Sequence, residues 1–91
     1  MFDKTTRTLM AMLFERGAVD EIEGKTADGS RWSVDCHRPN LFQDYTYFDG
    51  YVSGAYNEDF RGDTLEETLN KMDTWMEEKA GAVEMVRMVL V

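Results

Sequence analysis

A run of large apolar residues at helical spacing constrains the fold of this chain more than any other feature. The pattern predicts an α-helix over residues 64–79 with one apolar side. The residues on that side are Leu65, Leu69, Met72, Trp75 and Met76. Asp63 is predicted to be the N-cap, and Glu66, three residues later, completes an acidic form of the capping box. Gly81 is expected to end the helix.

A second helix is predicted near the start of the chain, over residues 3–16. Its apolar residues fall at i, i+1, i+4 and i+5 and form one stripe: Leu9, Met10, Leu13 and Phe14. Asp3 can cap the start of this helix, because its side chain can accept a hydrogen bond from the first turn. Gly17 stands where a left-handed residue would end it.

Residues 18–26 and 30–38 are predicted to form a β-hairpin around Asp28-Gly29. The second strand alternates and places three apolar side chains on one face: Trp32, Val34 and Cys36. A two-residue turn would set glutamates opposite these residues. A three-residue loop, with Gly29 in the left-handed position, pairs Ile22 with Val34 and Gly24 with Trp32. The three-residue loop is preferred because its register brings apolar groups together.

Two further segments have the composition of strands. Residues 44–56 are aromatic and β-rich, and Asp49-Gly50 makes them either a tight hairpin or one long strand with a bulge. Two strands, over about 44–48 and 51–56, are favoured. Residues 82–91 form a nearly continuous apolar run, which is typical of a strand buried on both faces or in the middle of a sheet.

Together these elements predict an α+β fold in a single domain, residues 1–91. The antiparallel sheet has four to five strands, and the order is helix, two strands, one or two strands, helix, strand. Ninety-one residues build only a small core, so a homodimer is a reasonable expectation.

The charge of the chain is strongly negative and unevenly spread. The net charge is −8, and residues 39–78 carry ten acidic side chains against Arg61 and Lys71. Direct binding of nucleic acid is not expected, because it requires lysines and arginines that neutralise phosphates. A basic protein is the natural partner, although solubility alone would also explain the charge.

The chain offers little for chemistry. Its one cysteine and one histidine, Cys36 and His37, are adjacent, and neighbours on a strand point to opposite faces. They therefore cannot form a catalytic pair, and they are too few for a zinc site. The chain is predicted to be no enzyme and to need no cofactor or metal, with Cys36 a core thiol. It has no leader and no apolar run of eighteen residues, so a cytoplasmic location without membrane contact is expected.

One segment resembles a known family. Gly62-Asp63-Thr64-Leu65-Glu66-Glu67, followed by Leu69, is similar to the strand–turn–helix part of HicB-like antitoxins, with Thr68 where that family has alanine. The family's Pro-Gly-Cys turn is replaced by Tyr56-Asn57-Glu58-Asp59-Phe60. The resemblance implies a strand that leads into the helix, and a partner that is a toxin.

The whole chain resembles another group in size, charge and order of elements. These are the small acidic α+β inhibitors that phages and mobile elements encode, including anti-CRISPR proteins and other DNA mimics. Carboxylates three or four residues apart on a helix lie about 5–6 Å apart, comparable to the phosphate spacing along a strand. Glu66, Asp73 and Glu77 are expected to form such an outward column.

These observations lead to a functional hypothesis. The chain is predicted to be a non-enzymatic inhibitor whose acidic surface binds a basic, nucleic-acid-binding host protein, for example a CRISPR-Cas effector subunit. The alternative is a HicB-like antitoxin that neutralises a toxin. The predicted partner-binding residues are Glu58, Asp59, Asp63, Glu66, Glu67, Asp73, Glu77, Glu78, Tyr45, Tyr47 and Tyr51. The sequence leaves open whether the acidic or the aromatic members make the contact.

Overall fold

A computed structural model describes residues 2–26, 29–54, 57–79 and 83–90, the last strand by its backbone alone. The elements in chain order are α1 (Lys4–Glu15), β1 (Val19–Thr26), β2 (Arg31–His37), β3 (Tyr47–Ser53), β4 (Glu58–Gly62), α2 (Leu65–Lys79) and β5 (Val83–Leu90). The strands form one sheet in the order β4-β3-β2-β1-β5, and each neighbouring pair is antiparallel. The predicted α+β class and order of elements are confirmed.

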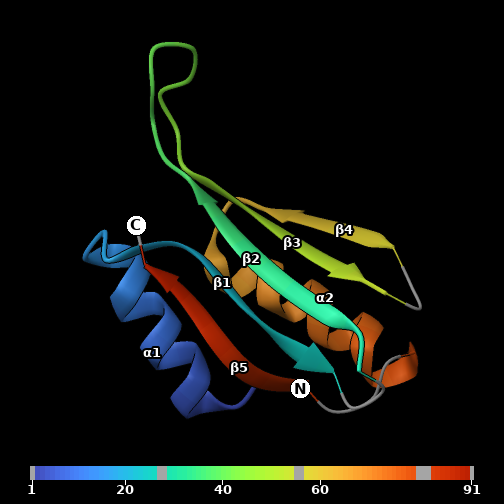
Figure 1. Ribbon diagram of the computed structural model, residues 1–91. Coiled ribbons are helices and arrows are strands. Elements are labelled where there is room, and N and C mark those ends of the chain that lie inside the picture. The colour runs from blue at the N-terminus through green and yellow to red at the C-terminus, as the bar shows by residue number, and fades with distance from the viewer. Residues whose placement is uncertain (1, 27–28, 55–56, 80–82, 91) are drawn as a thin grey trace.

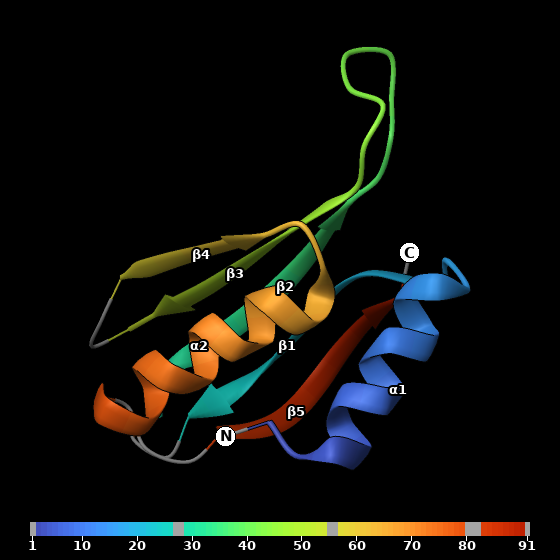
Figure 2. The ribbon, with the colours of Figure 1, turned by 180° about the vertical axis from the view of Figure 1, so that it is seen from behind.

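Both helices lie on one face of the sheet (Figures 1 and 2). α2 packs on β3 and β4, while α1 packs on β1 at the other side. Among the side chains that the structure describes, the core between these two layers is one cluster of buried apolar residues. Its members are Phe2, Met10, Phe14, Val19, Ile22, Trp32, Val34, Val52, Leu69, Met72 and Met76. The described residues put no helix on the opposite face, which we call the uncovered face.

The hairpin of β1 and β2 has the register predicted from the sequence. Ile22 pairs with Val34, and Gly24 pairs with Trp32. Gly29 has a φ of +86°, and the Thr26 N–H donates to the Ser30 carbonyl at 2.8 Å, which closes a three-residue loop. Asp28, the other residue of the predicted turn, lies outside the described residues. Trp32 and Val34 are buried, as their alternation predicts, and Cys36 is partly buried beside them.

The ends of α1 are also confirmed. Asp3 accepts a hydrogen bond of 2.7 Å from the Thr6 N–H. This bond is the main cause, and an interaction with the Thr6 hydroxyl the second cause, that holds the pKa of the Asp3 carboxyl below its usual range. The cap therefore acts fully above the ordinary aspartate pKa and weakens as the pH falls through the lowered value. Gly17 has a φ of +68°, and the Ala18 N–H donates to the Leu13 carbonyl at 3.0 Å, a Schellman end.

The favoured division of residues 44–56 into two strands is wrong. β3 runs without a turn through Asp49-Gly50, and its whole length pairs with β2. Gly50 is buried, and a Cβ at this position would clash with the Met72 side chain of α2. Gly50 therefore serves the close approach of helix to sheet, which a sequence pattern does not distinguish from a turn.

The two edges of the sheet differ from expectation as well. Residues 58–62, which have few apolar side chains, form the edge strand β4 by pairing with β3. β5 is the opposite edge and pairs with β1, so of the two alternatives for this segment the place in the middle of the sheet is wrong. The predicted burial of its side chains lies outside the described residues.

The N-cap of α2 is Thr64, and the assignment of Asp63 is wrong by one residue. The Glu67 N–H donates to the Thr64 hydroxyl at 3.1 Å, and the Glu67 carboxylate accepts from the Asp63 N–H at 3.2 Å. Thr64 and Glu67 thus form a variant of the capping box, in which the carboxylate binds the N–H one residue before the N-cap, because β4 keeps the chain extended through Gly62. The predicted helix end at Gly81 lies outside the described residues.

This cap gives a direct test. Thr64→Ala is expected to lower the free energy of unfolding by about 0.5–2 kcal/mol, because the Glu67 N–H loses its acceptor. Asp63→Ala is the matched control, because it keeps the backbone N–H that binds Glu67. It is expected to lower the free energy of unfolding less than Thr64→Ala does. Urea unfolding followed by circular dichroism measures both. A larger loss for Asp63→Ala would contradict the assignment.

Candidate functional site

The structure separates the predicted partner-binding residues into two surfaces, one buried position, Asp73, and one exposed position at the start of α2, Asp63, which lines a pocket. The first surface, which we call the helical acidic surface, consists of exposed carboxylates on α2 and on the helix side of β4: Glu58, Glu66, Glu67, Glu77 and Glu78. The second is the uncovered face, which carries Tyr47, Tyr51 and Asp59, with Tyr45 beside Tyr47. The two surfaces lie on opposite sides of the molecule, so a flat partner cannot contact both.

The basic side chains near the helical acidic surface are Lys71, beside Glu67, and Lys4 and Arg7, which line a hollow together with Glu66. Lys71 pairs with Glu67 at 3.4 Å and donates to the Arg61 carbonyl at 2.6 Å. Among the described residues, Glu66, Glu77 and Glu78 make no salt bridge. Glu66 and Glu77 are eleven positions apart on the helix, which places them about 16 Å from each other along the axis.

Asp73 does not belong to this surface, and the expected column of carboxylates is therefore interrupted. Asp73 is only 9% exposed. Its carboxylate accepts a 2.8 Å hydrogen bond from the Phe2 N–H and forms a salt bridge with Arg7. The segment before α1 and α1 itself cover this side of α2, which the periodicity of the helix alone could not predict.

The uncovered face holds a compact cluster around Asp49. His37 Nε2 lies 3.2 Å from Asp49 Oδ2, and Arg61 Nε lies 3.6 Å from Asp49 Oδ1. The Tyr47 ring stacks on His37 with a centroid distance of 4.5 Å and a 9° interplanar angle. From β4, the Arg61 guanidinium carbon lies 3.9 Å from the centre of the same ring.

The members of this cluster hold one another in place. Both oxygens of Asp49 have a cationic or imidazole neighbour, and Tyr47 is held by residues of β2 and β4. Tyr45 is 55% exposed and Tyr51 36% exposed, and the Tyr51 hydroxyl donates to Asn57 at 3.2 Å. Tyrosines held in place in this way are frequent at protein interfaces. Cys36 lies on the core side, so it forms no dyad with His37.

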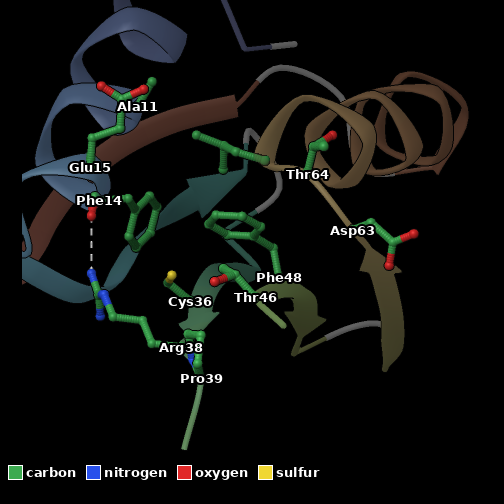
Figure 3. Close-up of a pocket in the computed structure, with 11 residues that line it drawn as sticks. Ala11, Phe14, Glu15, Cys36, Arg38, Pro39, Thr46, Phe48, Asp63 and Thr64 are labelled. Atoms are coloured by element: carbon green, nitrogen blue, oxygen red, sulfur yellow. Dashed lines mark hydrogen bonds between the residues drawn. The ribbon is translucent and has the colours of Figure 1, made fainter. Parts of the chain in front are cut away.

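A pocket of about 460 Å³ opens between α1, the start of α2 and the ends of β2 and β3 (Figure 3). Its apolar floor includes Phe14, Phe48, Cys36 and Leu65, and the Phe14 and Phe48 rings meet edge to face at 5.5 Å. Burial raises the pKa of the Cys36 thiol.

Arg38 fixes one wall of this pocket. It forms a salt bridge with Asp20 and donates to the carbonyls of Phe14 at 3.1 Å and Val19 at 3.0 Å. These bonds join the end of α1 and the start of β1 to the segment that follows β2. The pocket wall is therefore held by one guanidinium that satisfies two backbone acceptors.

The residues that sequence reasoning missed lie in the connection between β2 and β3. This segment, residues 38–46, projects beyond the sheet (Figures 1 and 2), and we call it the finger. Leu41 and Phe42 at its end are each 96% exposed. Their only signal in the sequence is two apolar residues directly after Pro39-Asn40, a pair typical of loops.

No protein-family model, no curated protein and no solved structure matches this chain. The described residues contain no group of three or more histidine, cysteine or carboxylate side chains placed to hold a metal ion. In the same part of the chain, neither helix has the length and apolar character needed to cross a bilayer.

Proposed function

We propose that the chain is a non-enzymatic binding protein that inhibits a basic, nucleic-acid-binding protein through its helical acidic surface. The observation that carries this proposal is the set of exposed glutamates on α2, of which Glu66, Glu77 and Glu78 make no salt bridge within the described residues. Solvated carboxylates of this kind attract lysines and arginines over several ångströms and accelerate the encounter with a basic partner.

The burial of Asp73 changes the form of the proposed recognition. The carboxylates near Glu66 and near Glu77 form two groups, one at each end of α2, in place of one continuous ladder. A partner would therefore present two basic patches about 16 Å apart. A CRISPR-Cas effector subunit, with a basic groove for guide or target, is one class of protein that offers such patches.

A displacement assay tests this proposal. Purified basic proteins, including CRISPR-Cas effector subunits and small basic toxins, are each bound to a fluorescent DNA or RNA fragment. The chain is then added at increasing concentration. Release of the fragment by wild type, with less release by Glu66→Lys/Glu77→Lys/Glu78→Lys, is the expected result. If wild type and the triple variant displace the fragment equally, the acidic surface is not the contact.

An antitoxin-type function is the second candidate, and one observation favours it. β4 leads through Gly62-Asp63-Thr64 directly into α2. This is the strand–helix order that the resemblance to HicB-like antitoxins implies. Under this alternative the partner in the displacement assay is a small basic toxin, and co-expression of the chain restores growth to cells that produce the toxin.

A further inference from the structure

The tip of the finger is an ordered turn that presents two apolar side chains. The Phe42 N–H donates to Asn40 Oδ1 at 2.7 Å, and the Asn40 N–H donates to the Gln43 carbonyl at 2.9 Å. The Gln43 side-chain amide donates to the Tyr45 carbonyl at 3.1 Å. These bonds fix the backbone while Leu41 and Phe42 remain 96% exposed. A single exposed apolar residue is ordinary, but two adjacent ones on a fixed, projecting turn are typical of interface anchors.

The charge of the tip differs from that of the rest of the chain. Residues 39–43 contain no ionisable side chain, whereas the whole chain has a net charge of −8. Two copies of so acidic a protein repel each other over most of their surfaces. A contact between copies is least opposed where it is made by the uncharged tip.

A receptor of matching chemistry lies at the base of the same finger. The pocket of about 460 Å³ has Phe14, Cys36, Phe48 and Leu65 in its floor, and Arg38, Pro39 and Thr46 of the finger form part of its wall. This volume falls within the range of about 300–1,000 Å³ that is typical of ligand pockets. The apolar floor matches the chemistry of Leu41 and Phe42, while Glu15, Arg38 and Asp63 supply the charged part of the lining.

We propose that the finger tip of one copy docks in the pocket of a second copy, and that the two exchange tips around a two-fold axis. Because the pocket lies at the base of the finger, two fingers that run antiparallel side by side place each tip at the other copy's pocket. The contact is then closed and isologous, as in most soluble dimers. This dimer is independent of the proposed partner.

The area of the contact sets the expected affinity. Each aromatic side chain buries about 150–250 Å², so the four exchanged side chains and the pocket walls that cover them bury a total area near the roughly 1,200 Å² at which stable interfaces begin. The dimer is therefore weak and reversible. Salt screens the repulsion between the two acidic copies, so the dimer strengthens as salt rises, opposite to a complex with a basic partner.

Sedimentation equilibrium over about 10–500 µM protein tests the dimer at low and at high salt. The high-salt samples need more than 0.15 M salt, because at 0.15 M the Debye length is still about 8 Å and charges closer than this repel each other. Wild type is expected to move toward twice the monomer mass as concentration and salt rise. Leu41→Ser/Phe42→Ser should remain monomeric, because the apolar anchor is lost. Tyr51→Ser, a control on the uncovered face, should behave as wild type. A wild-type chain that stays monomeric throughout overturns the proposal.

A cross-linking experiment identifies the contact itself, because Cys36 lines the pocket and is the only cysteine. Phe42→Cys is oxidised with copper phenanthroline at alkaline pH, since burial raises the pKa of the Cys36 thiol. An interchain disulfide between positions 42 and 36, found by peptide mass mapping, is expected. It should disappear in Phe42→Cys/Cys36→Ser. Linkage only between the two copies of position 42 would show tip-to-tip contact and contradict the docking.

Discussion

Trp32→Ala is expected to lower the free energy of unfolding by about 3–5 kcal/mol, a large part of the 5–15 kcal/mol that stabilises a typical domain. Trp32 is 1% exposed and pairs with Gly24, where the opposite strand has no side chain. Its ring meets Phe2 edge to face, at 4.8 Å and 88°. Phe2 in turn is tied to α2 through Asp73. Removal of the indole therefore opens a cavity between the sheet, the N-terminal segment and α2.

Urea unfolding followed by circular dichroism measures this loss, and Trp75→Ala is the matched control. Trp75 is half-buried and packs against Phe60 at the side of α2, with a centroid distance of 5.7 Å. Removal of its side chain leaves a space that solvent can fill. The free energy of unfolding is therefore expected to decrease less for Trp75→Ala than for Trp32→Ala. Equal decreases for the two tryptophans would contradict the placement of Trp32 at the centre of the core.

Sequence patterns predicted the parts of the fold that depend on interactions between residues close together in the chain. The caps of α1 follow from Asp3 and Gly17, and the register of β1 with β2 follows from alternation and from Gly29. Gly50 was misinterpreted because its role is to admit Met72 of α2, a contact across the core. Residue patterns did not predict β4, because its pairing with β3, and not its own composition, makes it a strand; only the resemblance to HicB-like antitoxins implied a strand before the helix.

The candidate site shows the same division. The exposed glutamates of α2 follow from helical periodicity, since they lie opposite the apolar side. Asp73 does not, because the residue that pairs with it, Arg7, is 66 positions away in the chain. The projection of Leu41 and Phe42 depends on how β2 and β3 extend past the sheet, so composition could not distinguish them from core residues.

The second large effect concerns association with the proposed basic partner. Reversal of Glu66, Glu77 and Glu78 to lysine is expected to slow association by about tenfold or more, because steering by surface charge changes on-rates by roughly 10–10³. The fold should persist. Lysine is disfavoured near the start of α2 but favoured near its end, so the helix-dipole contributions largely cancel. Glu67 is left unchanged because it belongs to the capping box.

A matched control separates the helical acidic surface from charge in general. Asp35→Lys/Asp44→Lys/Asp59→Lys makes the same change in net charge at positions away from α2. This control is expected to associate with the partner much faster than Glu66→Lys/Glu77→Lys/Glu78→Lys, which we call the α2 variant. Its association rate should still be somewhat lower than that of wild type. If both variants slow association equally, net charge alone acts and no particular surface is recognised.

The most direct measurement is the stopped-flow association rate with a protein identified by the displacement assay, taken from low to high salt. The wild-type rate is expected to fall steeply with salt, since the Debye length shrinks from about 30 Å at 0.01 M to about 8 Å at 0.15 M. The association rate of the α2 variant should be low already at low salt and should change little as salt rises. A wild-type rate that is independent of salt and equal to that of the α2 variant would contradict the account and direct attention to Tyr45, Tyr47 and Tyr51 on the uncovered face.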